Sequence, residues 1–302
     1  MIIPMNSILL LGGSGFLGLN WIRYSPGAFI TPTFNTSIPK IGENWRKFSF
    51  TGENVEELQE LITRVKPQLI LNCAALTSID VCEINETKAH ILNYELPKNL
   101  ACVSKALGIK LIHISTDHFA SEHLTPRSEF ENMIPVNVYG DSKLKAEQII
   151  SRINPEALIV RVNFFGFGVA KKSNLLDEII LKLSRGENFY GFTDVQFNPI
   201  SIEQVVVGVN MLIKLGASGL INLAGNQIVS KFDFTQIVSE VFDLDKSLVK
   251  PHSSSGHQTG VRRVNYLPLD NTKFTNLTGH KFPTLRGMLD QLKEDTIWHR
   301  VD

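Results

Sequence analysis

The stretch Ile8-Leu9-Leu10-Leu11-Gly12-Gly13-Ser14-Gly15-Phe16-Leu17-Gly18 decides the fold of this chain. Its apolar start has the length of a short buried strand, and a G-x-x-G-x-x-G pattern follows directly. In a strand–loop–helix unit, the first glycine allows a tight turn, the second lets the backbone approach a pyrophosphate, and the third lets the helix pack on the strand. The N–H groups at the start of that helix are free to bind phosphates. The stretch predicts a dinucleotide site, and we prefer this interpretation to a glycine-rich turn without a ligand.

Apolar runs and amphipathic stretches alternate along the first half of the sequence. We expect helices where apolar residues recur with a helical period, and strands at the short apolar runs between them. This alternation predicts a Rossmann-type, doubly wound parallel sheet of the α/β class, with helices on both faces. Besides the helix after the glycine loop, the expected helices are residues 55–65, 86–107 (kinked near Pro97) and 138–150, and the expected strands are residues 7–11, 28–34, 47–50, 68–72, 110–115 and 157–162.

The second half is less regular. Helical patterns lie at residues 175–184, 202–215, 231–242 and 283–292, a short strand is expected at 220–223, and the stretches 186–199 and 250–260 have the composition of surface loops. We therefore predict a dinucleotide-binding Rossmann domain at residues 1–163. Residues 164–302 are predicted to form mainly a smaller, C-terminal substrate-binding lobe, with some segments returning to the first domain.

The composition is that of an ordinary globular enzyme, with 302 residues, 43% of them hydrophobic. Lys+Arg and Asp+Glu both count 30, so no basic excess indicates a nucleic-acid partner. Cys73, Cys82 and Cys102 lack metal-site spacing, so we expect no metal and reduced, cytoplasmic thiols. The first residues carry no basic leader, and the apolar run after them is too short to cross a membrane. We expect neither a signal peptide nor a membrane span.

The end of the second predicted strand bears on cofactor choice. Dinucleotide sites select NAD with an acidic residue about 20 positions after the glycine loop. This chain has Thr33-Phe34-Asn35-Thr36-Ser37 there, and its first acid after the loop is Glu43. Asn35, Thr36, Ser37 and Lys40 can donate to a 2′-phosphate. We predict that NADP(H) is preferred over NAD(H), although no arginine follows the strand. A plain polar loop is the alternative.

A tyrosine and a lysine mark a candidate catalytic site. Tyr139 and Lys143 are four residues apart, on one face of the helix expected at 138–150. A phenol has a pKa near 10, and a nearby cation lowers it by roughly one to three pH units. Thr116 lies at the end of the strand expected at residues 110–115, where its hydroxyl group can hydrogen-bond a substrate carbonyl. The pattern predicts general acid catalysis by Tyr139, with the hydride supplied by a nicotinamide cofactor. Lys143 is also placed to hydrogen-bond the ribose of that cofactor. An ordinary surface Tyr–Lys pair is the alternative.

Seven motifs spread over most of the chain carry a family resemblance. They are GGSGFLG (12–18), NCAALT (72–77), Asn93, ISTD (114–117), NVYGDSKL (137–144), RVNF (161–164) and LDNTK (269–273). With these motifs the chain resembles the extended short-chain dehydrogenase/reductases, and within them the dTDP-4-dehydrorhamnose reductase (RmlD-like) group of nucleotide-sugar reductases.

The resemblance implies a role for individual residues. Thr116, Tyr139 and Lys143 match the catalytic residues of the family, and Asn93 matches a residue that holds two strands together. Arg262 and Arg263 are candidates to bind the diphosphate of a nucleotide-sugar, because the shape of a guanidinium group suits phosphate. The alternative is that both are solvated surface arginines. With the polar residues after the second strand included, the cofactor-binding candidates are Gly12, Ser14, Gly15, Phe16, Leu17, Gly18, Asn35, Thr36, Ser37, Ala74, Ala75, Leu76, Tyr139, Lys143 and Asn163, and the substrate-binding candidates are Thr77, Asp117, Phe164, Arg262 and Arg263.

Two departures from the family lie on the substrate side. The reductases usually continue Ser-Thr-Asp with Tyr-Val-Phe-Asp-Gly, and this chain has His118-Phe119-Ala120-Ser121-Glu122. Phe164 stands where a tryptophan commonly packs on the sugar. These changes leave the identity of the sugar open. The related 4,6-dehydratases carry a glutamate where this chain has His118, which argues against dehydration.

Together these features predict a cytoplasmic NAD(P)H-dependent reductase of a 4-keto nucleotide-sugar, with a homodimer as its expected assembly. One alternative is an epimerase or dehydratase of the same superfamily. The other is a regulatory subunit that binds a dinucleotide without turnover, because fold-level resemblance does not fix function.

Overall fold

The computed structural model describes residues 7–36, 38–39, 43–168, 174–256 and 260–295. The chain divides into two compact units. The first unit comprises residues 1–116, 135–161 and 212–221, and the second comprises residues 117–134, 162–211 and 222–302. The assignment of cofactor binding to residues 1–163 and of substrate binding to residues 164–302 stays a prediction.

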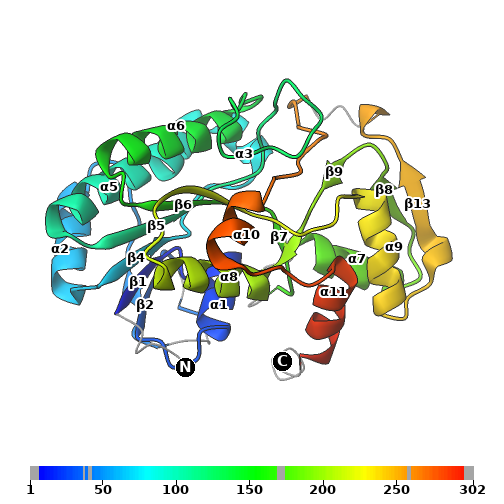
Figure 1. Cartoon of the computed structure of the whole chain (residues 1–302), viewed down its shortest axis with the longest axis horizontal. Helices are drawn as coiled ribbons and strands as arrows, with labels where there is room; N and C mark the ends of the chain where they lie inside the picture. The colour runs from blue at the N-terminus through cyan, green and yellow to red at the C-terminus, as the bar shows by residue number, and fades with distance from the viewer. Residues whose placement is uncertain (1–6, 37, 40–42, 169–173, 257–259, 296–302) are drawn as a thin grey trace. The chain divides into compact units, whose positions relative to one another are not determined.

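A seven-stranded sheet with the order β11-β6-β5-β4-β1-β2-β3 forms the centre of the first unit (Figure 1). The pairs from β3 to β6 are all parallel, which confirms the predicted Rossmann-type fold. β6 and β11 end in residues of the second unit. The strands are β1 (Ile8–Leu11), β2 (Ile30–Phe34), β3 (Arg46–Lys47), β4 (Leu69–Asn72), β5 (Lys110–Ile114), β6 (Leu158–Val162) and β11 (Gly219–Leu223).

Helices cover both faces of this sheet. α2, α5 and α6 pack their apolar residues against one face, in a core that includes Leu9, Ile70 and Leu111 of the strands. α1 lies on the opposite face (Figure 1). The helices of the unit are α1 (Phe16–Arg23), α2 (Val55–Val65), α3 (Ile79–Ile84), α4 (Glu86–His90), α5 (Leu96–Leu107) and α6 (Val138–Ile153).

The helix expected at residues 86–107 is broken in a specific way. α4 and α5 are joined by η1 (Ile91–Glu95), a turn of π-helix, and Pro97 lies in the first turn of α5. A proline is tolerated there because the first N–H groups of a helix have no partner within it. The irregularity found in this helix is the π-helical turn before Pro97, and a kink at Pro97 itself stays a prediction.

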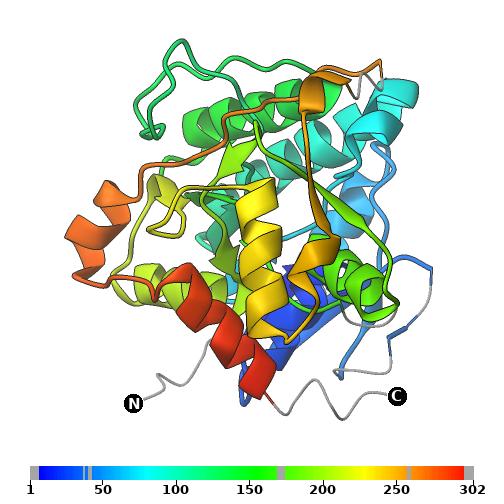
Figure 2. The same ribbon diagram turned by 90° about the vertical axis from the view of Figure 1, so that its right-hand side faces the viewer.

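The second unit is built around α9 (Lys231–Val241). This helix contacts α7 (Leu175–Ser184), α11 (Leu285–Glu294) and the strands β8 (Phe189–Phe192) and β13 (Val249–His252). Figure 2 shows α9 and α11 side by side. The remaining elements are β7 (Phe164–Phe165), β9 (Gln196–Phe197), β10 (Ile200–Ser201), β12 (Val229–Ser230), η2 (Lys246–Leu248), η3 (Ser254–Gly256), α10 (Thr272–Thr278) and α8 (Ile202–Lys214), whose last residues belong to the first unit.

Two stretches expected to be loops contain strands. β8 and β9 lie within residues 186–199, and β13 overlaps residues 250–260. β8 and β13 pair in parallel, from Val249 opposite Phe189 to His252 opposite Phe192. The prediction was wrong because Gly191 and Pro251 suggest turns. A side chain at Gly191 would meet the backbone of Phe232 at 2.6 Å, so this glycine permits a close approach within the unit.

Candidate functional site

The glycine loop links the carboxyl end of β1 to α1. Gly12 has a φ of +75°, and a Cβ atom there would lie 2.6 Å from the backbone nitrogen of Ala74. A Cβ atom at Gly18 would lie 2.4 Å from the carbonyl oxygen of Gly12. Side chains at both positions are therefore excluded. The amide of Gly12 donates to Thr33 Oγ1 (3.2 Å), and that of Gly15 donates to Gly12 O (2.9 Å), which fixes the tight turn.

A cavity of about 530 Å³ opens beside this loop. Its walls come from the carboxyl ends of β1, β2 and β4, around the point where the strand order reverses between β1 and β4. Open α/β sheets bind ligands at this point. Six of the predicted cofactor residues line the cavity, namely Gly12, Ser14, Gly15, Asn35, Ala74 and Ala75.

Other predicted cofactor residues lie near the cavity without lining it. Phe16, Leu17 and Gly18 belong to the first turn of α1, and Leu17 is buried. Thr36 is exposed. Leu76 is held through its backbone by Asn93, and Ser37 and Lys40 lie outside the described residues.

The structure adds residues that sequence reasoning missed. Lys88 of α4 and its neighbours Asn85 and Thr87 also line the cavity. Arg46 of β3 pairs with Thr33 of β2, so a guanidinium group lies on the strand beside the end of β2 although no arginine directly follows β2 in sequence. The sequence pattern that could have identified Arg46 is the short strand expected at residues 47–50, because the strand at this place, β3, includes Arg46 and pairs with β2.

Asn93 lies in η1 and connects a loop to a helix. Its Oδ1 accepts from the amide of Leu76 (2.8 Å), and its Nδ2 donates to Leu76 O (3.0 Å) and to Ser142 Oγ (3.1 Å). Asn93 therefore ties the segment after β4 to α6, and these bonds join a loop and a helix where the resemblance implied two strands.

Tyr139 and Lys143 lie on successive turns at the start of α6. The side chain of Asn137 caps this helix by accepting from the amide of Gly140 (2.8 Å), so the position of Tyr139 in the first turn is well fixed. Tyr139 and Lys143 are both buried, as is Thr116, two residues after β5. The first unit thus contains the three predicted catalytic residues and the cavity.

Lys143 is held by the strand next to its helix. Its Nζ donates to the carbonyl of Ile114 (2.6 Å) and lies 3.2 Å from His113 Nε2. Burial lowers the pKa of Lys143 to about 8, against the opposing charge of Glu147. The pKa of His113 is lowered well below its usual value, first by burial and then by Lys143, so its imidazole is neutral.

In the second unit, the buried Asp117 contacts Asn163, which is another predicted site residue, and His118, which is not. Its carboxylate accepts from Asn163 Nδ2 and lies 3.6 Å from His118 Nδ1. Burial raises the pKa of Asp117, but the hydrogen bonds from His118 and Asn163 and the charges of His118 and Arg127 outweigh it, and the pKa is lowered. This carboxyl group therefore remains ionised.

Lys231 belongs to the same surroundings and was missed. Its Nζ lies 3.4 Å from the centre of the Phe197 ring. Burial lowers its pKa to about 8, against the attraction of Asp117. In the sequence this residue is an ordinary lysine at the start of a helix, so no signal distinguished it.

The remaining substrate candidates are less closely organised. Phe164 is partly buried in β7, where it pairs with Ile200 of β10. Arg262 and Arg263 are exposed in the segment that follows Gly260, and Thr77 is exposed after β4.

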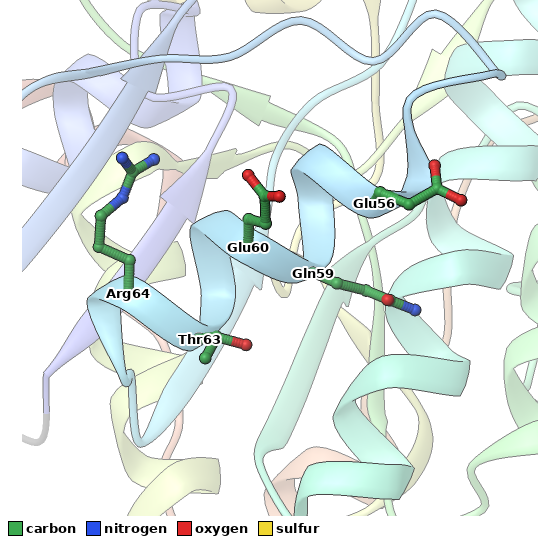
Figure 3. Close-up of a pocket in the computed structure, with 5 residues that line it drawn as sticks. All are labelled: Glu56, Gln59, Glu60, Thr63 and Arg64. Atoms are coloured by element: carbon green, nitrogen blue, oxygen red, sulfur yellow. The ribbon is translucent and has the colours of Figure 1, made fainter.

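A second hollow lies on the outer surface of α2. Figure 3 shows its residues, which all come from this one helix: Glu56, Gln59, Glu60, Thr63 and Arg64. Both signs of charge mix on an exposed helix face there, as expected of a solvated surface. Among the described residues, no group of three or more His, Cys, Asp and Glu could hold a metal ion, and no helix is long and apolar enough to span a membrane.

Known proteins resemble this chain over most of its length. "Probable low-salt glycan biosynthesis reductase Agl14" of Haloferax volcanii is 28% identical over 288 residues, covering 93% of this chain and 95% of the relative. The dTDP-4-dehydrorhamnose reductase of Mycobacterium tuberculosis is 29% identical over 213 residues, covering 68% and 69%. Methionine adenosyltransferase 2 subunit beta of Mus musculus is 25% identical over 303 residues, covering 96% and 88%.

A solved structure shares the fold. The dTDP-4-dehydrorhamnose reductase of Bacillus anthracis, in complex with NADP, superposes with a TM-score of 0.84 and 23% identity, covering 96% of this chain and 99% of that one. The family described as "RmlD substrate binding domain" matches residues 5–297. The resemblance inferred from the seven motifs is confirmed, and the chain belongs to the RmlD substrate binding domain family.

Proposed function

We propose that this protein is an NADP(H)-preferring reductase of a 4-keto nucleotide-sugar. The observation that carries the proposal is the buried pair Tyr139 and Lys143 on α6, in the unit that also contains Thr116 and the glycine-loop cavity. The two reductases among the relatives support a reductive activity. Dimer formation and a cytoplasmic location stay predictions.

The cavity residues fit a dinucleotide. Gly12 and Gly18 leave no room for side chains, so the backbone of the loop can approach a pyrophosphate at the start of α1. Ala74 and Ala75 offer small side chains to the opposite wall. When bound, the nicotinamide cofactor supplies the hydride.

The chain's own residues perform the proton chemistry in this proposal. Thr116 donates a hydrogen bond to the carbonyl oxygen of the substrate, and Tyr139 donates the proton that this oxygen takes up. Lys143 orients the cofactor ribose. Asp117, Asn163 and Phe164 are proposed to contact the sugar or the nicotinamide. Thr77 is proposed to contact the substrate. Arg262 and Arg263 are proposed to bind the diphosphate.

A specific observation keeps a second function in view. The relatives include a methionine adenosyltransferase subunit that matches 96% of this chain. A chain of this family could bind a dinucleotide and regulate a partner without turnover. The dehydratase alternative has weaker support, because His118 stands where the dehydratases carry a glutamate.

The direct test is a screen of 4-keto nucleotide-sugars for NADPH oxidation by the full chain. Steady-state oxidation with one of these sugars supports the reductase. Binding of NADPH without turnover of any sugar supports the regulatory alternative. Protein that is purified with tightly bound oxidised cofactor and regenerates it in each turnover supports an epimerase or dehydratase.

We expect NADPH to bind more tightly than NADH. No acid lies between β2 and Glu43, and Arg46 and Lys47 pair with residues at the end of that strand. Asn35→Asp should shift the preference toward NADH, because the new carboxylate repels the 2′-phosphate. Fluorescence titration with both cofactors measures the change.

The control for this variant is Gln59→Glu, which adds the same charge on the outer face of α2 (Figure 3). It should leave the ratio of the two affinities unchanged. A preference for NADH in the unmodified protein would contradict the cofactor assignment.

If Arg262 or Arg263 binds the substrate diphosphate, replacing it with alanine should mainly raise KM. A hydrogen bond to a charged group contributes about 1.5–3 kcal/mol, which corresponds to a rise of about 10- to 150-fold. Arg152→Ala, at an exposed arginine of α6, is the matched control. Unchanged kinetics in both single variants and in the double variant would identify the two arginines as surface residues.

A further inference from the structure

Two polar side chains buried in the first unit, Asn72 and His113, have no part in the proposed reaction. Only 1% of each is exposed, and they connect Lys143 to the backbone of the cofactor cavity. They are direct partners on the neighbouring parallel strands β4 and β5. Their side chains therefore lie on the same face of the sheet as the core under α6.

The directions of the hydrogen bonds follow from one end of this chain of contacts. The amide of Ala74 can only donate, and it donates to Asn72 Oδ1 (3.1 Å). The Nδ2 group of Asn72 is then the one that faces His113 Nδ1, at 3.1 Å, and it can only donate. His113 Nδ1 must accept. A neutral imidazole has one donor and one acceptor, so its proton is on Nε2.

This proton points at Lys143. His113 Nε2 lies 3.2 Å from Lys143 Nζ, and an N–H group there needs an acceptor. An ammonium group has no lone pair and cannot accept, whereas a neutral amine can. The other bond of Lys143, to the carbonyl of Ile114, can be donated by either form. The hydrogen-bond chain is therefore satisfied only when Lys143 is neutral.

The other charged and titratable groups around Lys143 do not fix its protonation state, which depends on its hydrogen bonds to His113 and Ile114. Burial already lowers its pKa to about 8. Glu147, one turn further along α6, is engaged by Arg161 and Ser115. Cys73 is not a counter-charge at neutral pH, because burial raises the pKa of its thiol far above the usual value. Tyr139 lies one turn before Lys143 on the same helix.

We propose that Asn72 and His113 are positioning residues, which fix the Nε2–H tautomer of His113 and so favour the neutral amine form of Lys143 over its ammonium form before the cofactor binds. Ribose hydroxyl groups favour the ammonium form, which donates three hydrogen bonds. At a pH above the pKa of unliganded Lys143, cofactor binding then takes up one proton from solvent at this residue. The role of Lys143 toward the ribose rests on the proposed function, and the tautomer of His113 does not.

The tautomer can be measured directly. Two-bond ¹H–¹⁵N correlation spectra of the full chain, labelled with ¹⁵N-histidine, should show His113 protonated on Nε2 at pH 7.5. Asn72→Asp should move the proton to Nδ1, because a carboxylate accepts from both Ala74 and His113. An Nδ1–H tautomer in the unmodified protein overturns the proposal without recourse to any variant.

The matched control is Asn154→Asp. Asn154 is also buried in the first unit and donates to Ser104, but it lies about 16 Å beyond Lys143 along α6. It adds the same carboxylate outside the relay and should leave the tautomer of His113 unchanged. A tautomer that changes equally in both variants would show that charge alone decides it, against the proposal.

A second readout follows Lys143 itself. In ¹³Cε-lysine spectra, Asn72→Asp should raise the pKa of Lys143 from about 8 toward its ordinary value of 10.5. The affinity of the unmodified protein for NADPH should fall about tenfold per pH unit above the pKa of unliganded Lys143, whereas that of Asn72→Asp should hold to higher pH.

The outcomes separate this inference from the proposed function. Identical pH profiles of NADPH affinity in the two proteins overturn the relay. If NADPH does not bind at all but His113 has the expected tautomer and responds to Asn72→Asp, the relay stands and the cofactor assignment fails.

Discussion

Tyr139→Phe is expected to lower keto-sugar reduction by at least about a hundredfold, with NADPH affinity close to that of the unmodified protein. The change removes one oxygen atom and keeps the ring of a buried side chain, so the packing of α6 should survive. The proton donor is lost, and a positioned acid contributes about 10²–10⁴-fold in rate. Stopped-flow turnover on the sugar found in the screen, together with NADPH titration, measures both quantities.

Tyr190→Phe provides the matched control. Tyr190 is 59% exposed on β8, so the same loss of an oxygen atom there should leave turnover unchanged. Full turnover by Tyr139→Phe would refute the assigned proton donor. If the unmodified protein itself turns over no keto-sugar while it binds NADPH, the regulatory function becomes the better explanation.

Lys143→Met should differ from Tyr139→Phe in a defined way. In the proposed site Lys143 has two roles: it lowers the pKa of Tyr139, and it hydrogen-bonds the cofactor ribose. Its loss should therefore reduce turnover and weaken NADPH binding together. A Lys143→Met protein that binds NADPH as tightly as the unmodified protein would confine Lys143 to the proton chemistry.

The first unit was predictable because its signals are local. Residues 8–11 and 157–160 are continuous apolar runs, and the strands that contain them, β1 and β6, are buried along their length. The helix predicted at 175–184 in the second unit has the predicted bounds, since Asn174 and Asp177 form a capping box at its start. The glycine loop was predictable for the same reason, because its spacing is a property of one short segment.

The rest depended on residues far apart in sequence. β8 and β13 pair across about 60 residues, and each contains a residue typical of turns, Gly191 in β8 and Pro251 in β13. His113 lies in the strand Lys110–Ile114, and in the sequence nothing distinguishes it from the core residues around it. Only the pairing of β5 with β4, and the packing of α6, bring it to Asn72 and Lys143. Arg46 gained its position beside Thr33 in the same way.

The buried pair of Arg161 and Glu147 should make the largest single contribution to stability that this site offers. Arg161 Nε lies 2.9 Å from Oε1 of Glu147, and Nη2 lies 2.6 Å from Oε2, with side chains only 3% and 5% exposed. Removing one partner of a buried pair costs about 3–5 kcal/mol, because the other charge stays buried without compensation. Arg161→Met should therefore lower the free energy of unfolding by this amount in urea denaturation.

The exposed pair of Lys145 and Asp141, on the same helix, is the control. Their side chains are 55% and 45% exposed, and such pairs contribute about 0–1 kcal/mol. The double variant Arg161→Met/Glu147→Met should recover part of the loss, since it leaves no unpaired charge. Equal effects of Arg161→Met and Lys145→Met would show that the buried pair is unimportant. Because Glu147 also accepts from Ser115, next to Thr116, the pair fastens α6 to the strands that carry the proposed catalytic residues.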